Sequence, residues 1–94
     1  MVKLTVTIFP KQRKRLELIQ SLYLFLESLN SPGTELLLLD KPSRFVLLLD
    51  FENREKLNLF FAGSDFEVMK SAAKTLGTQW EMLVDGEKVE DVMG

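Results

Sequence analysis

Two leucine-rich runs on either side of a short polar joint are the most regular feature of the chain. Residues 35–39 read ELLLL, residues 40–43 read DKPS and residues 44–51 read RFVLLLDF. Neither run alternates apolar with polar residues, as a strand with one face in water does, because successive side chains of a strand point to opposite faces. The pattern predicts a hairpin of two strands, connected by DKPS, that is apolar on both faces.

The N-terminal third predicts a strand followed by a long helix. Residues 2–9 alternate, which gives the strand two faces, one with Val2, Leu4, Val6 and Ile8 and the other with Lys3, Thr5, Thr7 and Phe9. Pro10 ends this strand and suits the start of a helix over residues 11–30, which the turn residues of NSPGT, 30–34, then stop. The stripe expected to face the core is formed by Leu16, Ile19, Tyr23, Leu26 and Leu29, widened by Leu18, Leu22 and Phe25.

The segment after the hairpin predicts a short helix and then a second long one. Residues 52–63 have the clustered apolar residues of a short helix. Residues 64–77 follow as a long helix, in which Ser64 is a suitable N-cap and Glu67 completes a capping box. Gly77 is of the type that commonly follows the last turn of a helix.

The order of the main elements predicts the fold class. Residues 79–84 read as a last strand, before an Asp-Gly turn and a weakly structured tail. The order β-α-β-β-α-β is the ferredoxin-like arrangement, an α+β fold with an antiparallel sheet. Crossover connections are nearly always right-handed, so both long helices are expected on one face of the sheet.

The second face of this sheet then needs a cover from another molecule. If about five leucine-sized side chains stayed in water there, the lost burial would be roughly 8–15 kcal/mol, which is comparable with the whole stability of a small domain. A symmetric homodimer, sheet face against sheet face, is the simplest remedy. The alternative is that some of these leucines point outward or pack under the C-terminal tail.

Composition narrows the class of protein. The 94 residues are expected to form one domain, 1–94, with 46% hydrophobic and 28% charged residues. The net charge of −2 gives no reason to expect nucleic acid as a partner. No apolar run approaches the ~20 residues that span a bilayer, so no membrane association is expected. The alternating N-terminus does not read as a signal peptide, which favours a cytoplasmic location.

The absence of two residue types limits the chemistry. The chain has no Cys and no His. Disulfides, thiolate nucleophiles, Cys/His zinc sites and His as a general base are therefore excluded, as are His and Cys as axial haem ligands. No cofactor and no metal are expected.

The central part of the sequence resembles the antibiotic biosynthesis monooxygenase domain family. The family pattern is a Pro-Gly turn, two strands with a short joint, an aromatic residue, a short helix and an S-x-x-F helix start. The matching segments, within a resemblance that covers residues 3–84, are Pro32-Gly33, Phe45-Val46-Leu47-Leu48, Phe51, Asn53-Arg54-Glu55-Lys56-Leu57 and Ser64-Asp65-Phe66. The resemblance implies a dimeric α+β barrel with a small-ligand cavity between sheet and helices. It also implies cofactor-free oxygenation of quinols or polycyclic aromatics, or haem degradation.

Several positions depart from the pattern of that family. Many relatives have a His where this chain has Phe60, and another where it has Asp65. The haem-degrading branch uses an Asn on the first strand, a Trp on the short helix and a His on the second long helix. The nearest residues here are Leu4 or Thr5, Phe60 or Phe61, and Ser71. These departures argue against haem degradation and leave open whether the protein is an enzyme.

The residues proposed to bind a ligand come from three segments. Thr5 and Thr7 could orient a carbonyl or phenol, although Thr is also a common strand residue. Phe60, Phe61, Phe66 and Met69 could form the floor of an apolar pocket or belong to the core. Trp80 could stack on a ligand or lie in the core or the dimer interface. A cavity between the sheet face of Thr5 and Thr7 and the three Phe residues is the predicted location.

Charged residues give weaker candidates. The basic run KQRKR, 11–15, could hold an anionic group at the start of a helix, but a solvated helix end is the ordinary interpretation. Asp50, Glu52 and Asp85 could each supply a base, but no two carboxylates converge by sequence spacing. No catalytic residue is therefore assigned. Two hypotheses remain, a cofactor-independent monooxygenase acting on a small aromatic or quinol, and a non-catalytic dimer that binds a small apolar molecule or serves as an interaction module.

Overall fold

The computed structural model describes residues 1–29 and 33–89. Its elements, in chain order, are β1 Val2–Pro10, α1 Arg15–Leu29, β2 Thr34–Leu39, β3 Arg44–Phe51, α2 Arg54–Ala62, α3 Ser64–Leu76, β4 Gly77–Val84 and β5 Glu87–Lys88. The strands form one sheet in the order β2-β3-β1-β4-β5, and every neighbouring pair is antiparallel. The predicted α+β, ferredoxin-like fold is confirmed. A two-residue fifth strand lies in the segment that was expected to be weakly structured.

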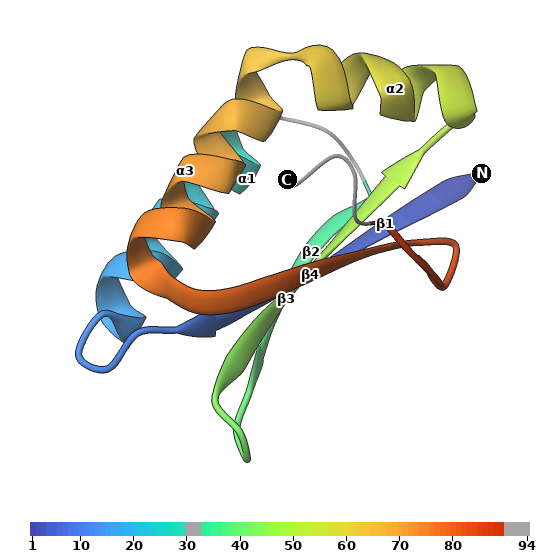
Figure 1. Cartoon of the computed structure of the whole chain (residues 1–94). Coiled ribbons are helices and arrows are strands. Elements are labelled where there is room, and N and C mark those ends of the chain that lie inside the picture. Colours follow the sequence, from blue (N-terminus) through green and yellow to red (C-terminus); the bar gives the residue numbers. More distant parts are fainter. Residues whose placement is uncertain (30–32, 90–94) are drawn as a thin grey trace.

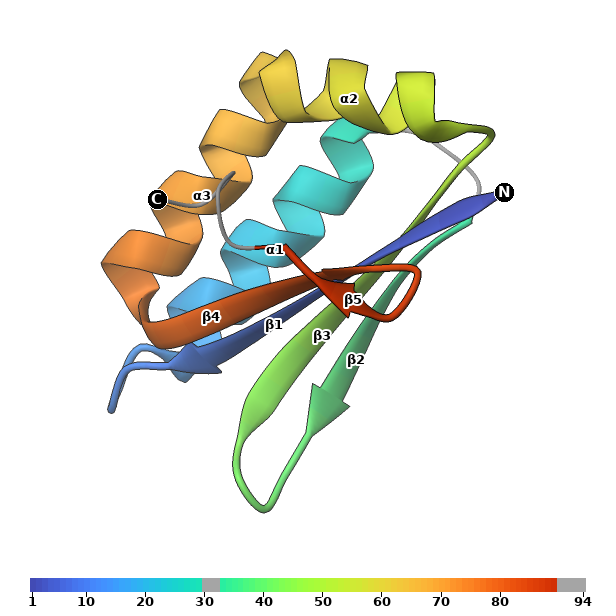
Figure 2. The same cartoon turned by 45° about the vertical axis from the view of Figure 1, so that its right-hand side comes forward.

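The helices cover one face of the sheet, and in residues 1–29 and 33–89 no helix lies over the other face (Figures 1 and 2). On the covered face the strands contribute Leu4, Val6, Ile8, Phe45, Leu47, Leu49, Met82 and Val84 to the core. The helices contribute Leu18, Leu22, Phe25, Leu57, Phe66, Met69 and Ala73. All these side chains are nearly or fully buried, so the core lies between the helices and a single face of the sheet.

The register explains why the hairpin is apolar on both faces. Along β3, Phe45, Leu47 and Leu49 point to the helices, whereas Val46 and Leu48 point to the opposite face. The first set is buried and the second half-buried. The second set lies among apolar residues of other strands, so the sheet has two apolar faces, as the sequence predicted.

The start of α1 differs from the prediction. Pro10 is the last residue of β1, and the helix begins at Arg15 after a turn in which Arg13 has a positive φ of 69°. The chain is fixed there because the Lys11 amide donates to the carbonyl of Leu76 at 2.8 Å. The predicted stop of this helix, NSPGT, lies largely outside the described residues. Pro10 therefore continues the strand and does not open the helix.

The predicted cap of α3 is also wrong. Ser64 is the first helical residue, Gly63 occupies the N-cap position, and no side chain caps this end. The N-cap with a side-chain bond belongs to α2, where Asn53 Oδ1 accepts a hydrogen bond from the Lys56 amide at 3.0 Å. A capping box needs Ser at the N-cap and Glu three residues later, at N3. Because Gly63 is the N-cap, Glu67 falls one position beyond N3.

Candidate functional site

Five phenylalanines form a cluster at one end of the helix-covered side. We call this the aromatic cluster, and its members are Phe25, Phe51, Phe60, Phe61 and Phe66. Phe60 is its centre, with ring centroids 5.3 Å from Phe51 and 5.6 Å from Phe66. The edge-to-face contacts of Phe66, to Phe60 and to Phe61 at 5.0 Å, are of the favourable type for aromatic pairs.

The local sequence explains why these rings meet. The short helix α2 follows β3 almost at once, and its Leu57 is fully buried, which fixes the face that it turns to the core. Phe60 lies three residues after Leu57, on the same side of the helix. Phe60 and Phe61 remain half-buried, while Phe66 at the start of α3 is 1% exposed. The cluster therefore has a buried base and a partly accessible edge.

The structure separates the two threonines from this cluster. Leu4, Val6 and Ile8 of β1 face the helices, so Thr5 and Thr7 face the other way. Thr5 pairs with Leu48 and Thr7 with Val46, both on the uncovered face. A single cavity between these hydroxyls and the three Phe residues is therefore wrong, because the sheet itself lies between them.

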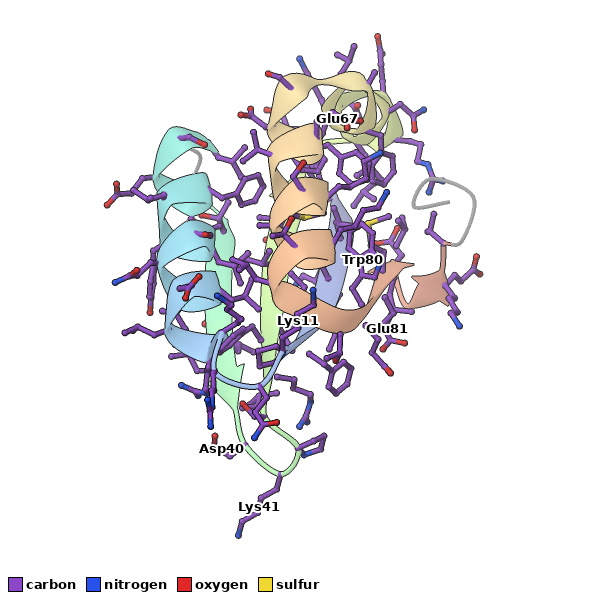
Figure 3. All side chains as sticks on the ribbon, turned by 60° about the vertical axis from the view of Figure 1, so that its left-hand side comes forward. Lys11, Asp40, Lys41, Glu67, Trp80 and Glu81 are labelled. Atoms are coloured by element: carbon purple, nitrogen blue, oxygen red, sulfur yellow. The ribbon has the colours of Figure 1, made fainter. Side chains whose placement is uncertain are left out.

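Trp80 lies on the helix side but away from the aromatic cluster. It pairs with Ile8 on β1, whereas Phe51 pairs with Val2. Six residues along a strand correspond to about 20 Å. Figure 3 shows Trp80 beside α3, where it is half-buried and packs against the core. The ring contacts of the cluster do not extend to Trp80 among the described residues.

The uncovered face has an apolar centre and a charged rim. We call its centre the open face, and it consists of Thr5, Thr7, Phe9, Leu37, Leu39, Val46, Leu48 and Leu83. All of these residues are half-buried in the single chain. Charged residues surround them on the same face, namely Lys3, Glu35, Arg44, Asp50 and Glu81. This distribution resembles the hydrophobic core and polar rim of a protein interface.

The charged candidates have structural roles. Within the basic run, Arg15 binds the hairpin connection, since its Nε donates to Ser43 Oγ at 3.1 Å and its guanidinium lies over the Phe45 ring at 5.2 Å. Figure 3 shows this hairpin end, with Asp40 and Lys41 labelled, at the opposite end of the molecule from Glu67. Arg15 therefore joins α1 to the hairpin.

Two of the carboxylates meet the same lysine. Asp85 Oδ1 accepts a hydrogen bond from the Lys3 amide at 2.9 Å, and Asp50 Oδ1 lies 3.9 Å from Lys3 Nζ. Asp85 closes the end of the β1–β4 pair, because its own amide also donates to the Lys3 carbonyl. Glu52 is exposed. The contacts of Asp50 and Asp85 therefore support the pairing of strands, and they do not involve the aromatic cluster.

One charged residue near the cluster was missed by sequence reasoning. Lys70 Nζ lies 5.3 Å from the centroid of the Phe66 ring, and 3.1 Å from Glu67 Oε1. The signal was present in FEVMK, 66–70, because residues four apart lie on one face of a helix. Lys70 brings a positive charge to the edge of an otherwise apolar cluster.

The site offers no other polar chemistry in the part of the chain that the structure describes. None of the buried side chains there is polar or charged. No group of three or more acidic residues in residues 1–29 and 33–89 is arranged to hold a metal ion. Within the same residues, no helix has the length and apolar character needed to cross a membrane.

The fold of this chain is similar to that of several solved structures. A crystal structure of an antibiotic biosynthesis monooxygenase matches with a TM-score of 0.76 and 18% identity, over 89% of this chain and 95% of that chain. A candidate antibiotic biosynthesis monooxygenase from Nitrosomonas europaea matches with 0.73 and 17%, over 89% and 95%. A protein from Mycobacterium tuberculosis matches with 0.76 and 16%, over 96% and 97%.

The chain thus has the fold of antibiotic biosynthesis monooxygenase structures, and the resemblance seen in the sequence is confirmed at the level of the fold. No family model matches the sequence, and no curated protein matches it either. At identities of 16–18% the likeness extends to the fold alone.

Proposed function

We propose that this protein binds a small, flat aromatic molecule or quinol at the aromatic cluster and oxidises it with O2 without a cofactor. The observation that carries the proposal is the partly accessible edge of Phe60 and Phe61, backed by buried Phe66, in a fold shared with structures described as monooxygenases. Aromatic side chains with few polar groups are typical of sites for apolar ligands.

The chemistry depends on the substrate, because the chain has neither His nor Cys. An activated CH2 group next to an aromatic carbonyl can lose a proton to water and form an electron-rich anion. This carbanion gives its electrons to O2, one oxygen atom becomes a new carbonyl on that carbon, and the other leaves as water with the two hydrogens. The protein contributes exclusion of water and orientation of the ring, both of which favour the anion's reaction over side reactions.

Oxygen consumption tests this proposal directly. With a hydroxyanthrone, which carries an activated CH2 group, the protein is expected to increase O2 uptake above the rate of spontaneous oxidation, with saturation at high substrate. Phe61→Ala should reduce this uptake about tenfold or more, because it removes a ring from the accessible edge. Thr7→Val is the matched control and should leave the uptake unchanged, since Thr7 faces away from the cluster. Equal loss in both variants would place the site elsewhere.

The second candidate is a non-catalytic protein that binds a small apolar molecule. It is favoured by the lack of any buried polar or charged side chain among the described residues, which leaves no buried acid or base. Saturable binding of a naphthoquinone, weakened by Phe61→Ala but without increased O2 uptake, would support this candidate over the oxygenase. The absence of both binding and uptake would exclude both.

We also propose that two copies of the chain pair through the open face to form a dimeric α+β barrel. The support is the apolar centre and charged rim of this face, together with the lack of any helix over it among the residues that the structure describes (Figure 2). Pairing would bury Leu37, Val46 and Leu48, which a monomer leaves partly in water.

Light scattering at micromolar concentration is expected to give twice the mass of one chain. Leu48→Arg places a charge in the centre of the open face and should shift the protein to monomers, because an unpaired charge in an apolar interface is costly. Leu59→Arg is the control, since Leu59 is 62% exposed on α2 and away from this face. A wild-type protein that remains monomeric would refute the pairing.

A further inference from the structure

The side chain of Lys70, on helix α3, is less exposed to solvent than those of other lysines of the chain. Its side chain is 18% exposed, against 46% for Lys14 and 54% for Lys3. Its ammonium group lies over the ring of Phe66, with Nζ 5.3 Å from the ring centroid. Lysine usually extends its ammonium group fully into water while its stem covers apolar surface. Here the ammonium group stays at the edge of the aromatic cluster.

The carboxylate that pairs with Lys70 is weakly held. Glu67 Oε1 lies 3.1 Å from Lys70 Nζ, but the Glu67 side chain is 66% exposed. Figure 3 shows Glu67 near the N-terminal end of α3. Pairs with one exposed partner contribute little to stability, because water solvates the carboxylate well and both side chains lose freedom. A second anion could therefore replace Glu67 at Lys70 without a large penalty.

We infer that Lys70 selects ligands that carry a negatively charged oxygen on an aromatic ring, such as a phenolate or a quinolate. This inference rests on the proposed function, and it specifies the class of molecule that the aromatic cluster takes. The ring of the ligand lies against the accessible edges of Phe60 and Phe61, and its oxygen accepts a hydrogen bond from the Lys70 ammonium group. A charge-assisted hydrogen bond of this kind is about twice as strong as a neutral one. It also favours the anion, which is the form that reacts with O2.

Two probes of similar shape distinguish the contribution of the ligand's charge to binding from that of its ring. 1,4-Naphthoquinone is neutral, whereas 2-hydroxy-1,4-naphthoquinone is an anion at neutral pH. Lys70→Met keeps an unbranched side chain at this position next to Phe66 and removes the charge. It is expected to weaken binding of the anion about tenfold or more, and to leave binding of the neutral quinone within about twofold. Glu67→Gln removes the competing carboxylate and should strengthen binding of the anion by about 2–5-fold.

Lys74→Met is the matched control, because Lys74 is exposed one turn further along the same helix. It should change neither affinity. Equal effects of Lys70→Met on both probes, or an effect of Lys74→Met as large as that of Lys70→Met, would overturn the inference while the aromatic site remained. If the wild-type protein binds neither probe, the inference and the proposed function both fail. Fluorescence of Trp80 or calorimetry provides the affinities.

Discussion

Leu47→Ala is expected to lower the free energy of unfolding by about 2–5 kcal/mol, the range for a buried leucine. Leu47 is fully buried in the middle of β3, where it pairs with Val6 on one side and Leu36 on the other. The truncation leaves a cavity between the sheet and the helices, and neighbouring strands are too well paired to close it. Urea denaturation measures the loss of unfolding free energy, provided that the dependence of this free energy on urea concentration has the same slope in both variants.

Leu38→Ala serves as the comparison, and it corrects an expectation from the sequence. The leucine-rich pattern predicted a hairpin that is apolar on both faces, so Leu38 in the middle of its strand was expected to be buried. The structure shows Leu38 to be 43% exposed on β2, the edge strand of the sheet. Its truncation should cost less than about 1 kcal/mol, because much of its surface stays in water. A cost equal to that of Leu47 would mean that another molecule covers this edge.

The strands were predicted well because the side-chain period along a strand is a local signal. The ELLLL and RFVLLLDF runs required apolar surroundings on two faces, and the register provides them. Handedness then placed α1 and α3 on one face. These predictions needed only side-chain period and chain direction, both of which the sequence contains.

The buried face of α1 was harder to predict. This helix has apolar residues around most of its circumference, so several stripes fit a period of 3.6. The predicted stripe began at Leu16 and passed through Tyr23, but both are exposed, at 67% and 48%. The buried residues are Leu18, Leu22 and Phe25, which were predicted only to widen the stripe and instead form its centre. The choice depends on where the helix begins and how it crosses the sheet, which is tertiary information.

The site was predicted in part. Phe60, Phe61 and Phe66 do contact one another, because the closeness of α2 and α3 in the chain brings their rings together. Thr5 and Thr7 were assigned to the same site, although strand alternation already placed them opposite the residues of β1 that form the core. The even-numbered face of β1 is entirely apolar, whereas Phe9 is the one apolar residue on the odd-numbered face, so the pattern itself favoured the even-numbered face for the core.

Gly77→Ala is expected to lower the free energy of unfolding by about 1–3 kcal/mol, the range for overpacking a filled site. At Gly77 the chain passes from α3 directly into β4, and its amide donates to the carbonyl of Ala73. A Cβ there would lie 2.6 Å from the Ala73 carbonyl oxygen and 2.9 Å from Ile8 Cγ2. The first of these is a backbone atom of the helix, so the junction itself must shift. The backbone angles are ordinary, with φ −108°, so the cost arises from contact alone.

Gly63→Ala is the matched control for this prediction, because Gly63 also follows a helix and has an ordinary φ of −95°. A Cβ at Gly63 would meet the carbonyl oxygens of Leu59 and Phe60 at 3.4 and 3.5 Å, which are normal contact distances. Alanine also restricts the unfolded chain, which stabilises by about 0.4–1 kcal/mol where the native angles allow it. Gly63→Ala should therefore be neutral or slightly stabilising, whereas Gly77→Ala destabilises. Urea denaturation measures both changes in stability. If the two variants change stability equally, the close approach of α3 and β4 at Gly77 does not constrain the fold.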